Sequence, residues 1–149
     1  MTFQTSVATA LPLVAPLQCP DTAAAIVIVA QSLQPDLVQG FQIDALRLRL
    51  EMERAFGGSD ATGAWDWKLA YEAGEVALVL FLRKFGRALL ARAGSLAALT
   101  PILAKVSGLL PTHTRRSEEM ERFQQFSTPL PMGLAALAAA KITHADLVL

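Results

Sequence analysis

The chain has 149 residues, with 13 Lys and Arg against 13 Asp and Glu, and a single cysteine. Hydrophobic residues make up 53% and charged residues 17%, which excludes disorder caused by low hydrophobicity and high charge. Because Cys19 has no second cysteine in the chain, a disulfide scaffold and a cysteine-based zinc site are both excluded. The formal net charge of zero does not favour a strongly basic nucleic-acid-binding protein. The length suits one domain, or a small domain with part of another.

No segment of the sequence predicts secretion or membrane insertion. The first 20 residues lack the positively charged start of a secretory signal and are interrupted by three prolines. The most apolar stretches, 23–30 and 76–82, are shorter than the roughly 20 residues that span a bilayer. We therefore expect a cytoplasmic protein without a membrane partner.

The first part of the chain predicts a lead-in followed by a helix. Residues 1–20 should be loosely ordered, because prolines and polar residues interrupt every apolar run. Asp21 is a good N-cap for a helix over 23–33, which Pro35 should stop. The β-branched residues 26–29 also allow a strand, but the flanking alanines favour the helix.

A second helix is expected over 43–55, with Asp44 near its start. Its apolar residues fall on two neighbouring faces: Ala45, Leu46, Leu50 and Met52. Its charged residues recur at helical spacing and are expected to face solvent: Arg47, Glu51 and Arg54. Residues 56–67 then predict the one clear loop inside the chain.

The longest predicted helix covers 65–93 and carries a broad apolar stripe that should face the core. Gly74 and Gly86 lie inside it, and each costs about 1 kcal/mol relative to alanine. We therefore expect close packing at both glycines. A further helix is expected over 95–110, capped by its first residue, with a kink or restart at Pro101.

After Pro111 the sequence changes from apolar helical patterns to polar and turn-forming residues. A polar stretch predicts a short helix over about 116–124, and a turn-rich segment with two prolines follows it. Residues 131–141 predict an alanine-rich helix. The last four residues, Asp-Leu-Val-Leu at 146–149, are typical of the opening of a buried strand, which has no obvious partner to pair with.

Charge is balanced over the whole chain but not within its halves. Residues 1–82 have four basic and nine acidic residues, whereas 83–149 have nine basic and four acidic, so the formal charges are −5 and +5. Such asymmetry can mark a face that contacts nucleic-acid phosphates. The candidates for those contacts are Arg83, Lys84, Arg87, Arg92, Arg115 and Arg116. Solvated helix faces and intramolecular ion pairs are the more ordinary interpretation, which residue chemistry alone favours.

The other residues with possible chemistry give weaker signals. Trp65 and Trp67 could stack on bases. A tryptophan just before a long helix more often seals the end of that helix against the core, and Asp66 could cap it. The pair Gly57-Gly58 lacks the spacing of a phosphate-binding loop. The two histidines lack partners at metal-ligand spacing, so we predict neither a metal site nor a catalytic residue.

The most informative stretch covers residues 110–149. Phe-Ser-Thr-Pro at 126–129, then a helix, then Asp-Leu-Val-Leu, resembles the beginning of amino-methylating DNA methyltransferases. The fuller run LPTHTRRSEE through QQFSTPLPMG, together with AFGGSDATGAWDWK, resembles bacterial strawberry-notch-like proteins. These are long chains that join a methyltransferase-like region to a superfamily II helicase. The resemblance covers most of residues 45–149.

The resemblance implies a fold and a set of site residues. The chain would be mainly α, a bundle of four to five helices followed by a helix–strand stub of a Rossmann-like methyltransferase domain. Its parts would be 1–20, a lead-in; 21–111, a helical domain; and 112–149, the incomplete start of the methyltransferase-like domain. The residues implied near S-adenosylmethionine are Phe126, Ser127, Thr128 and Pro129. The arginines implied to contact nucleic acid or to fix that segment are Arg115 and Arg116.

The sequence departs from the family pattern after residue 149, where the family's glycine-bearing cofactor loop would begin. The Asp/Asn-Pro-Pro-aromatic tetrad and the Walker-type helicase motifs are also absent. We therefore expect that this chain alone neither methylates nor unwinds DNA. Its helical part would brace or position the catalytic domain or DNA, and its C-terminal strand would favour self-association. The alternative is a stand-alone helical module that binds nucleic acid or a protein partner.

Overall fold

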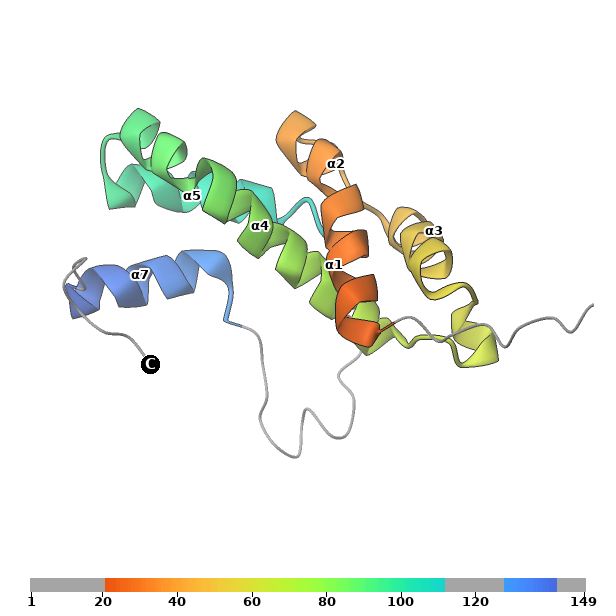
Figure 1. Cartoon of the computed structure of the whole chain (residues 1–149). Helices are drawn as coiled ribbons and strands as arrows, with labels where there is room; N and C mark the ends of the chain where they lie inside the picture. The colour runs from red at the N-terminus through yellow and green to blue at the C-terminus, as the bar shows by residue number, and fades with distance from the viewer. Residues whose placement is uncertain (1–20, 112–127, 142–149) are drawn as a thin grey trace, which may run out of the picture.

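The computed structural model describes residues 21–111 and 128–141, and within these ranges the chain is mainly helical, as the sequence predicts (Figure 1). The helices are α1 Thr22–Ser32, α2 Gln34–Gln39, α3 Ala45–Phe56, the short 3₁₀ helix η1 Asp60–Thr62, α4 Trp67–Ala93, α5 Leu96–Ser107 and α7 Leu130–Ala140. No strand occurs within these ranges. The predicted lead-in, the helix over 116–124 and the strand over 146–149 all lie outside the described residues, so the Rossmann-like stub has no support here.

Four helices begin where the sequence places a capping side chain. The carboxylates of Asp21, Asp44 and Asp66 and the hydroxyl of Ser95 each accept a hydrogen bond from a backbone N–H in the first turn. The distances are 3.2 Å to Ala23, 2.7 Å to Arg47, 2.8 Å to Leu69 and 3.2 Å to Ala98. These caps satisfy N–H groups that have no partner inside the helix, and the predictions for Asp21, Asp66 and Ser95 are confirmed.

The helix predicted over 23–33 is found as α1, which ends at Ser32, before Pro35, as predicted. The short helix α2 that follows is not predicted, and Pro35 occupies its first turn. Proline is tolerated there because the first N–H groups of a helix have no acceptor within it. Burial of Leu33 and Leu37 against the core holds α2 in place, and Gly40, with φ of 74°, ends it.

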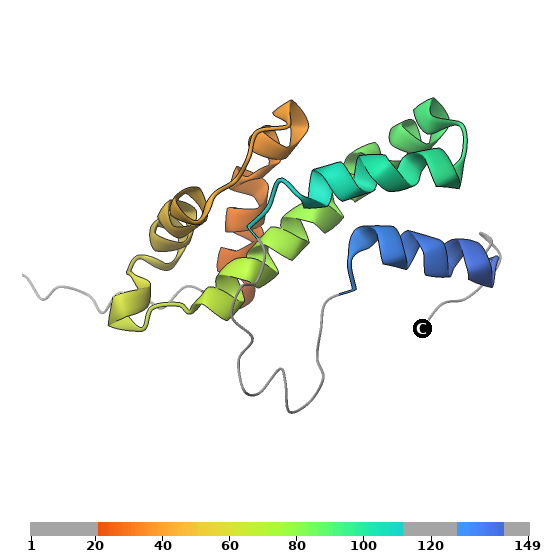
Figure 2. The same ribbon diagram turned by 180° about the vertical axis from the view of Figure 1, so that it is seen from behind.

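α4 is the central helix of the fold. Figures 1 and 2, seen from opposite sides, show α1 in front of α4 and α5 behind it. The buried residues of α4 are mostly small: Ala70, Ala73, Gly74, Ala77, Leu78 and Phe81. Small side chains let neighbouring helices approach closely, and burial of their apolar partners drives the packing. The core is completed by side chains from α1, α2, α3 and the turn after α5.

The two glycines inside α4 have different surroundings. A Cβ at Gly74 would meet the Leu110 side chain at 3.5 Å, so packing is close there, as expected. A Cβ at Gly86 would meet nothing within 4 Å, so the expectation of close packing is wrong at that position. The second half of α4 extends past the residues that bury its first half, which leaves Gly86 open.

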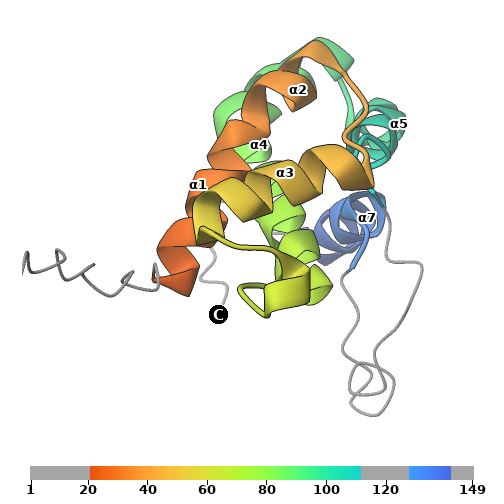
Figure 3. The same ribbon diagram turned by 90° about the vertical axis from the view of Figure 1, so that its right-hand side faces the viewer.

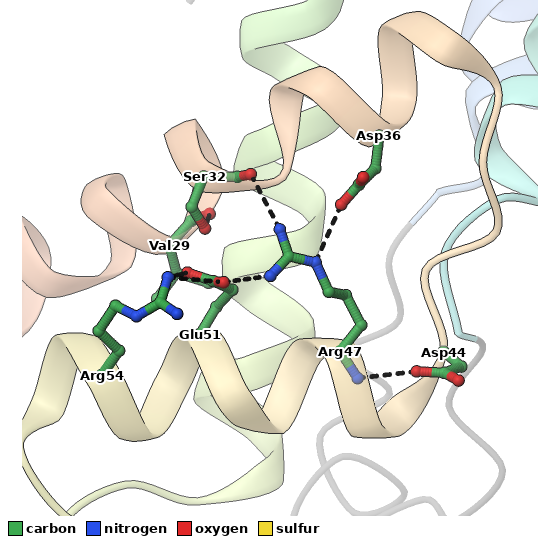
Figure 4. A network of polar contacts seen from close by, with 7 residues as sticks. All are labelled: Val29, Ser32, Asp36, Asp44, Arg47, Glu51 and Arg54. Atoms are coloured by element: carbon green, nitrogen blue, oxygen red, sulfur yellow. Dashed lines mark hydrogen bonds and ion pairs between the residues drawn. The ribbon is translucent and has the colours of Figure 1, made fainter.

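The orientation of α3 is also different from the prediction. Leu46 and Leu50 are exposed, at 64% and 49% of their surface, whereas Leu48 and Met52 are fully buried. Glu51, expected to face solvent, is only 3% exposed. Its helix is turned by a polar contact with α1 and α2, which the pattern of apolar residues in α3 alone does not contain (Figure 4).

That contact is a network centred on Arg47 (Figure 4). The guanidinium donates to Asp36 of α2 at 3.0 Å, to Glu51 of its own helix, and to the backbone carbonyl of Ser32 at 3.5 Å. Arg54 donates to both oxygens of Glu51, at 3.0 and 3.1 Å. The hydrogen bond to Asp36, with help from Glu51, outweighs partial burial and raises the pKa of Arg47 above its ordinary value. The buried carboxylate of Glu51 is therefore paired on both oxygens.

The segment between α3 and α4 is a folded connection rather than an open loop. It contains η1 and turns back beneath α3 to the start of α4 (Figure 3). The indole of Trp65 is 3% exposed and donates to the Gly58 carbonyl at 2.9 Å. The Asp60 carboxylate accepts from the Trp67 indole and from Arg49, both at 3.1 Å. These bonds fix the direction in which α4 leaves the loop.

The last described helix, α7, packs mainly against α5 (Figure 2). It covers Leu130–Ala140, close to the predicted 131–141, and has no charged residue. None of its residues is buried, and Met132 and Leu137 are 64% and 53% exposed. Only Leu130, at its start, packs against the main core. Across the described ranges, no helix combines the length and the apolar character needed to cross a membrane.

We expect Glu51→Gln to destabilise the protein by about 1–2 kcal/mol, because the buried carboxylate loses its charge-assisted bonds to two arginines. The effect is smaller than for a fully buried pair, since Arg47 and Arg54 are 37% and 74% exposed. Urea denaturation measures the change. Glu53→Gln, in the same helix and outside the ion pairs of the described residues, is the matched control and should stay within about 0.5 kcal/mol.

We expect Gly86→Ala to raise the free energy of unfolding by about 1 kcal/mol, because alanine favours the helix and its methyl group meets no atom. Gly94→Ala should have the opposite sign, since Gly94 ends α4 with φ of 75°, a conformation that strains alanine. Thermal or urea unfolding of both variants at low protein concentration checks the pair. Equal signs for the two would contradict the described end of α4.

Candidate nucleic-acid interface

The structure describes six of the ten residues that the sequence analysis assigns to a site, among them Lys84 and Arg92 on α4. Arg83 and Arg87 lie on the second half of α4, and both are exposed. Thr128 and Pro129 lie just before α7 and are exposed as well. The other four, Arg115, Arg116, Phe126 and Ser127, fall outside the described residues.

The second half of α4 contains four cations and no acidic residue. We call this set the basic half of α4: Arg83, Lys84, Arg87 and Arg92. From residue 83 to residue 111 the chain contains no Asp or Glu. All four side chains are exposed, and none takes part in the ion pairs found among the described residues. Cations without carboxylate neighbours keep their attraction for an external anion.

The spacing along the helix brings part of this set together. Arg83 and Arg87 are four residues apart, so they share one face and are separated by about 6 Å along the axis. Lys84 lies roughly 60° further around the helix than Arg87, which places it on the same flank. Arg92 lies about 140° from Arg87 and about 180° from Arg83, so it is on the other side of the helix from both arginines. Arg83, Arg87 and the neighbouring Lys84 can contact successive phosphates of one strand.

The arginines of the first half of the chain have a structural role instead. Arg47 and Arg54 bind Glu51, and Arg49 binds Asp60 at 3.1 Å. The guanidinium of Arg49 also lies 5.5 Å from the centre of the Trp67 ring. The ordinary interpretation, intramolecular pairing, is therefore correct for these residues. The basic half of α4 belongs to none of the ion pairs of the described residues; it is an exposed helix face, which the ordinary interpretation also allows.

The tryptophans are not placed to stack on bases. Trp65 is buried, and its indole N–H is bonded to the Gly58 carbonyl. Trp67 is half-buried, with Trp65 at 5.5 Å in an edge-to-face arrangement and Tyr71 at 6.0 Å. Both rings stabilise the start of α4, which confirms the structural interpretation.

Thr128 and Pro129 do not form a cofactor site in the described part of the chain. Pro129 is the N-cap of α7, and no side chain makes a capping hydrogen bond there. The described residues around them include no strand and no glycine loop that could surround S-adenosylmethionine. Phe126 and Ser127, the other two implied residues, lie outside the described residues, so the cofactor site stays a prediction and we derive no chemistry through it.

No family model, curated protein or solved structure matches this chain. The methyltransferase/helicase relationship consequently depends on the sequence resemblance alone, whereas the basic half of α4 stands on the geometry given above.

Proposed function

We propose that the helical region of residues 21–111 positions DNA for a methyltransferase/helicase-like protein, by contacting the phosphate backbone through the basic half of α4. The observation that carries the DNA contact is the exposed set Arg83, Lys84 and Arg87, which lie on one flank and belong to none of the ion pairs of the described residues. Arginine and lysine bind phosphate through charge-assisted hydrogen bonds.

The link to a methyltransferase/helicase comes from the sequence resemblance over residues 45–149. Within this proposal, S-adenosylmethionine and the catalytic motifs belong to the methyltransferase-like region and the helicase, and the helical region has a supporting role. Its partners are DNA and the remainder of such a protein. The connections of α4 to the rest of the fold support that role: the hydrogen bonds from Trp65 to Gly58 and from Trp67 to Asp60 fix its start, and α1 and α5 pack along it.

The contact we propose is with the backbone and not with the bases. Both tryptophans are held within the fold, and the described basic half of α4 includes no exposed aromatic ring, since Phe85 is half-buried. Phosphate contacts without base contacts give affinity without sequence preference.

The alternative is a stand-alone helical module that binds nucleic acid or a protein. The same basic half of α4 would serve a stand-alone nucleic-acid-binding module. An experiment separates the positioning role from the stand-alone module: the helical region is added to a methyltransferase of the family that the sequence resembles, and the reaction on DNA is measured. A change in KM for DNA at constant kcat favours the positioning role, because uniform binding alters KM and not the chemical step.

The purified chain should bind duplex DNA with an affinity that falls as salt rises, because each contacted phosphate releases counterions. The double variant Arg83→Ala/Arg87→Ala should reduce the slope of log K against log salt by about 2, at about 0.9 per lost contact. Fluorescence anisotropy with a labelled duplex of random sequence measures the slope.

Lys68→Ala is the matched control for this measurement. Lys68 is an exposed cation in the first turn of the same helix, outside the basic half. Its removal should change the slope of log K against log salt by less than about 0.3. No binding at low salt, or an equal loss for Lys68→Ala, would contradict the proposed contact.

A further inference from the structure

One face of α4 remains uncovered by the rest of the described chain. Val79 is 52% exposed although α1 and α5 pack on the same helix, because it lies about 200° around the axis from the buried Ala77. Leu82 is half-buried and Leu90 is 40% exposed. With Gly86, these residues are three, four and four positions apart, which places them on one stripe. We call Val79, Leu82, Gly86 and Leu90 the open stripe of α4.

Gly86 is the residue on this stripe that the fold of one chain does not explain. Glycine in the interior of a helix costs about 1 kcal/mol relative to alanine. No described atom lies within 4 Å of the position of its missing Cβ, so packing inside the chain does not compensate for that cost. A glycine between apolar residues on an open face lets the backbone of another helix approach closely.

Charge is distributed unevenly along the same face. On the N-terminal side of Val79 the stripe continues through Glu72, and on the C-terminal side Arg83 and Arg87 flank it. Glu72 lies about 10 Å before Val79, and Arg87 lies about 12 Å after it along the helix axis. Lys68 lies on the same face, about 16 Å before Val79. Between Glu72 and Arg87 the face is therefore acidic on the N-terminal side of Val79 and basic on the C-terminal side.

We propose that the open stripe of α4 binds the α4 of a second copy of this chain, in an antiparallel pair centred on Val79. In that register Val79 meets Val79 of the other copy, and Glu72 of each copy lies beside Arg87 of the other. A parallel pair would instead place Glu72 against Glu72 and Arg87 against Arg87, which repels. The antiparallel arrangement brings opposite charges together at both ends and buries the apolar centre.

The charge pattern is what selects a second copy as the occupant. A face that is complementary to itself after a half-turn fits another identical face. The exposed apolar residues of α7, Met132 and Leu137, offer no comparable argument, because α7 has no charged residue to choose a partner or a register. The predicted C-terminal strand, which lies outside the described residues, is not needed for this association.

The dimer and the proposed DNA contact share Arg83 and Arg87. Duplex DNA and a second copy should therefore compete for α4, and added DNA should shift the dimer toward monomer. Self-association is measured without DNA, so a failure of DNA binding leaves this inference standing. A failure of self-association likewise leaves the DNA contact intact.

Sedimentation equilibrium of the purified 149-residue chain tests the proposal. We expect a reversible monomer–dimer equilibrium, and Val79→Glu should weaken it about tenfold or more. Because Val79 is exposed within one chain, this variant should keep the circular dichroism of the parent. Leu46→Glu, which changes an equally exposed leucine on α3, is the matched control and should leave the dimer unchanged.

Charge reversal tests the register. Glu72→Arg and Arg87→Glu should each weaken the homodimer, because each places like charges together at both ends. An equal mixture of the two variants should form heterodimers of restored stability, since every Arg then faces a Glu. Weakening by each single variant is specific to the antiparallel pair; a parallel pair already has like charges at both ends and predicts no weakening by either variant.

A cross-link tests the centre of the pair. Val79→Cys in a Cys19→Ser background should form a disulfide-linked dimer under mild oxidation, because a residue on the two-fold axis meets its own copy. Ala97→Cys, an exposed position on α5, gives the background rate. A chain that stays monomeric at all concentrations, or cross-links no faster at Val79 than at Ala97, overturns the proposal. So does a dimer that Val79→Glu leaves intact, which would mean that another surface holds it.

Discussion

The packing of α1 against the first half of α4 is the constraint on which the rest of the structure depends. Ala70, Ala73, Gly74 and Ala77 provide so little side chain that α1 can approach α4 closely, whereas α5 folds back along the second half of α4 after the turn at Gly94 (Figures 1 and 2). The basic half and the open stripe lie on the sides of α4 that neither helix covers.

The polar network around Arg47 has a different role, because it decides which side of α3 faces the core. An amphipathic helix can rotate by one position at modest cost when its apolar residues lie on two neighbouring faces, as they do in α3. The contact with Asp36 removes this freedom, since Arg47 reaches α2 only when Leu48 and Met52 are buried and Leu46 and Leu50 are exposed (Figure 4). Such a network defines one arrangement rather than adding much stability.

Features that depend on neighbouring residues were predictable from the sequence, and features that depend on distant ones were not. The caps Asp21, Asp66 and Ser95 bond to groups two or three residues away, so local pattern is enough to find them. The rotation of α3 depends on Asp36, eleven residues from Arg47 and in another helix. The formation of α2, which has Pro35 in its first turn, depends on the burial of Leu33 and Leu37 in a core that includes residues much later in the chain.

The candidate site also combines a feature that neighbouring residues determine with one that only the fold determines. Counting charges locates an excess of cations after residue 82, but it cannot separate paired arginines from exposed ones. Arg47, Arg49 and Arg54 have carboxylate partners that the fold brings to them, and Arg83 and Arg87 lie where no acidic residue follows for thirty positions or more. An excess of charge in a sequence indicates a binding surface only when the fold leaves it exposed, and here the sides of α4 that α1 and α5 do not cover are where that happens.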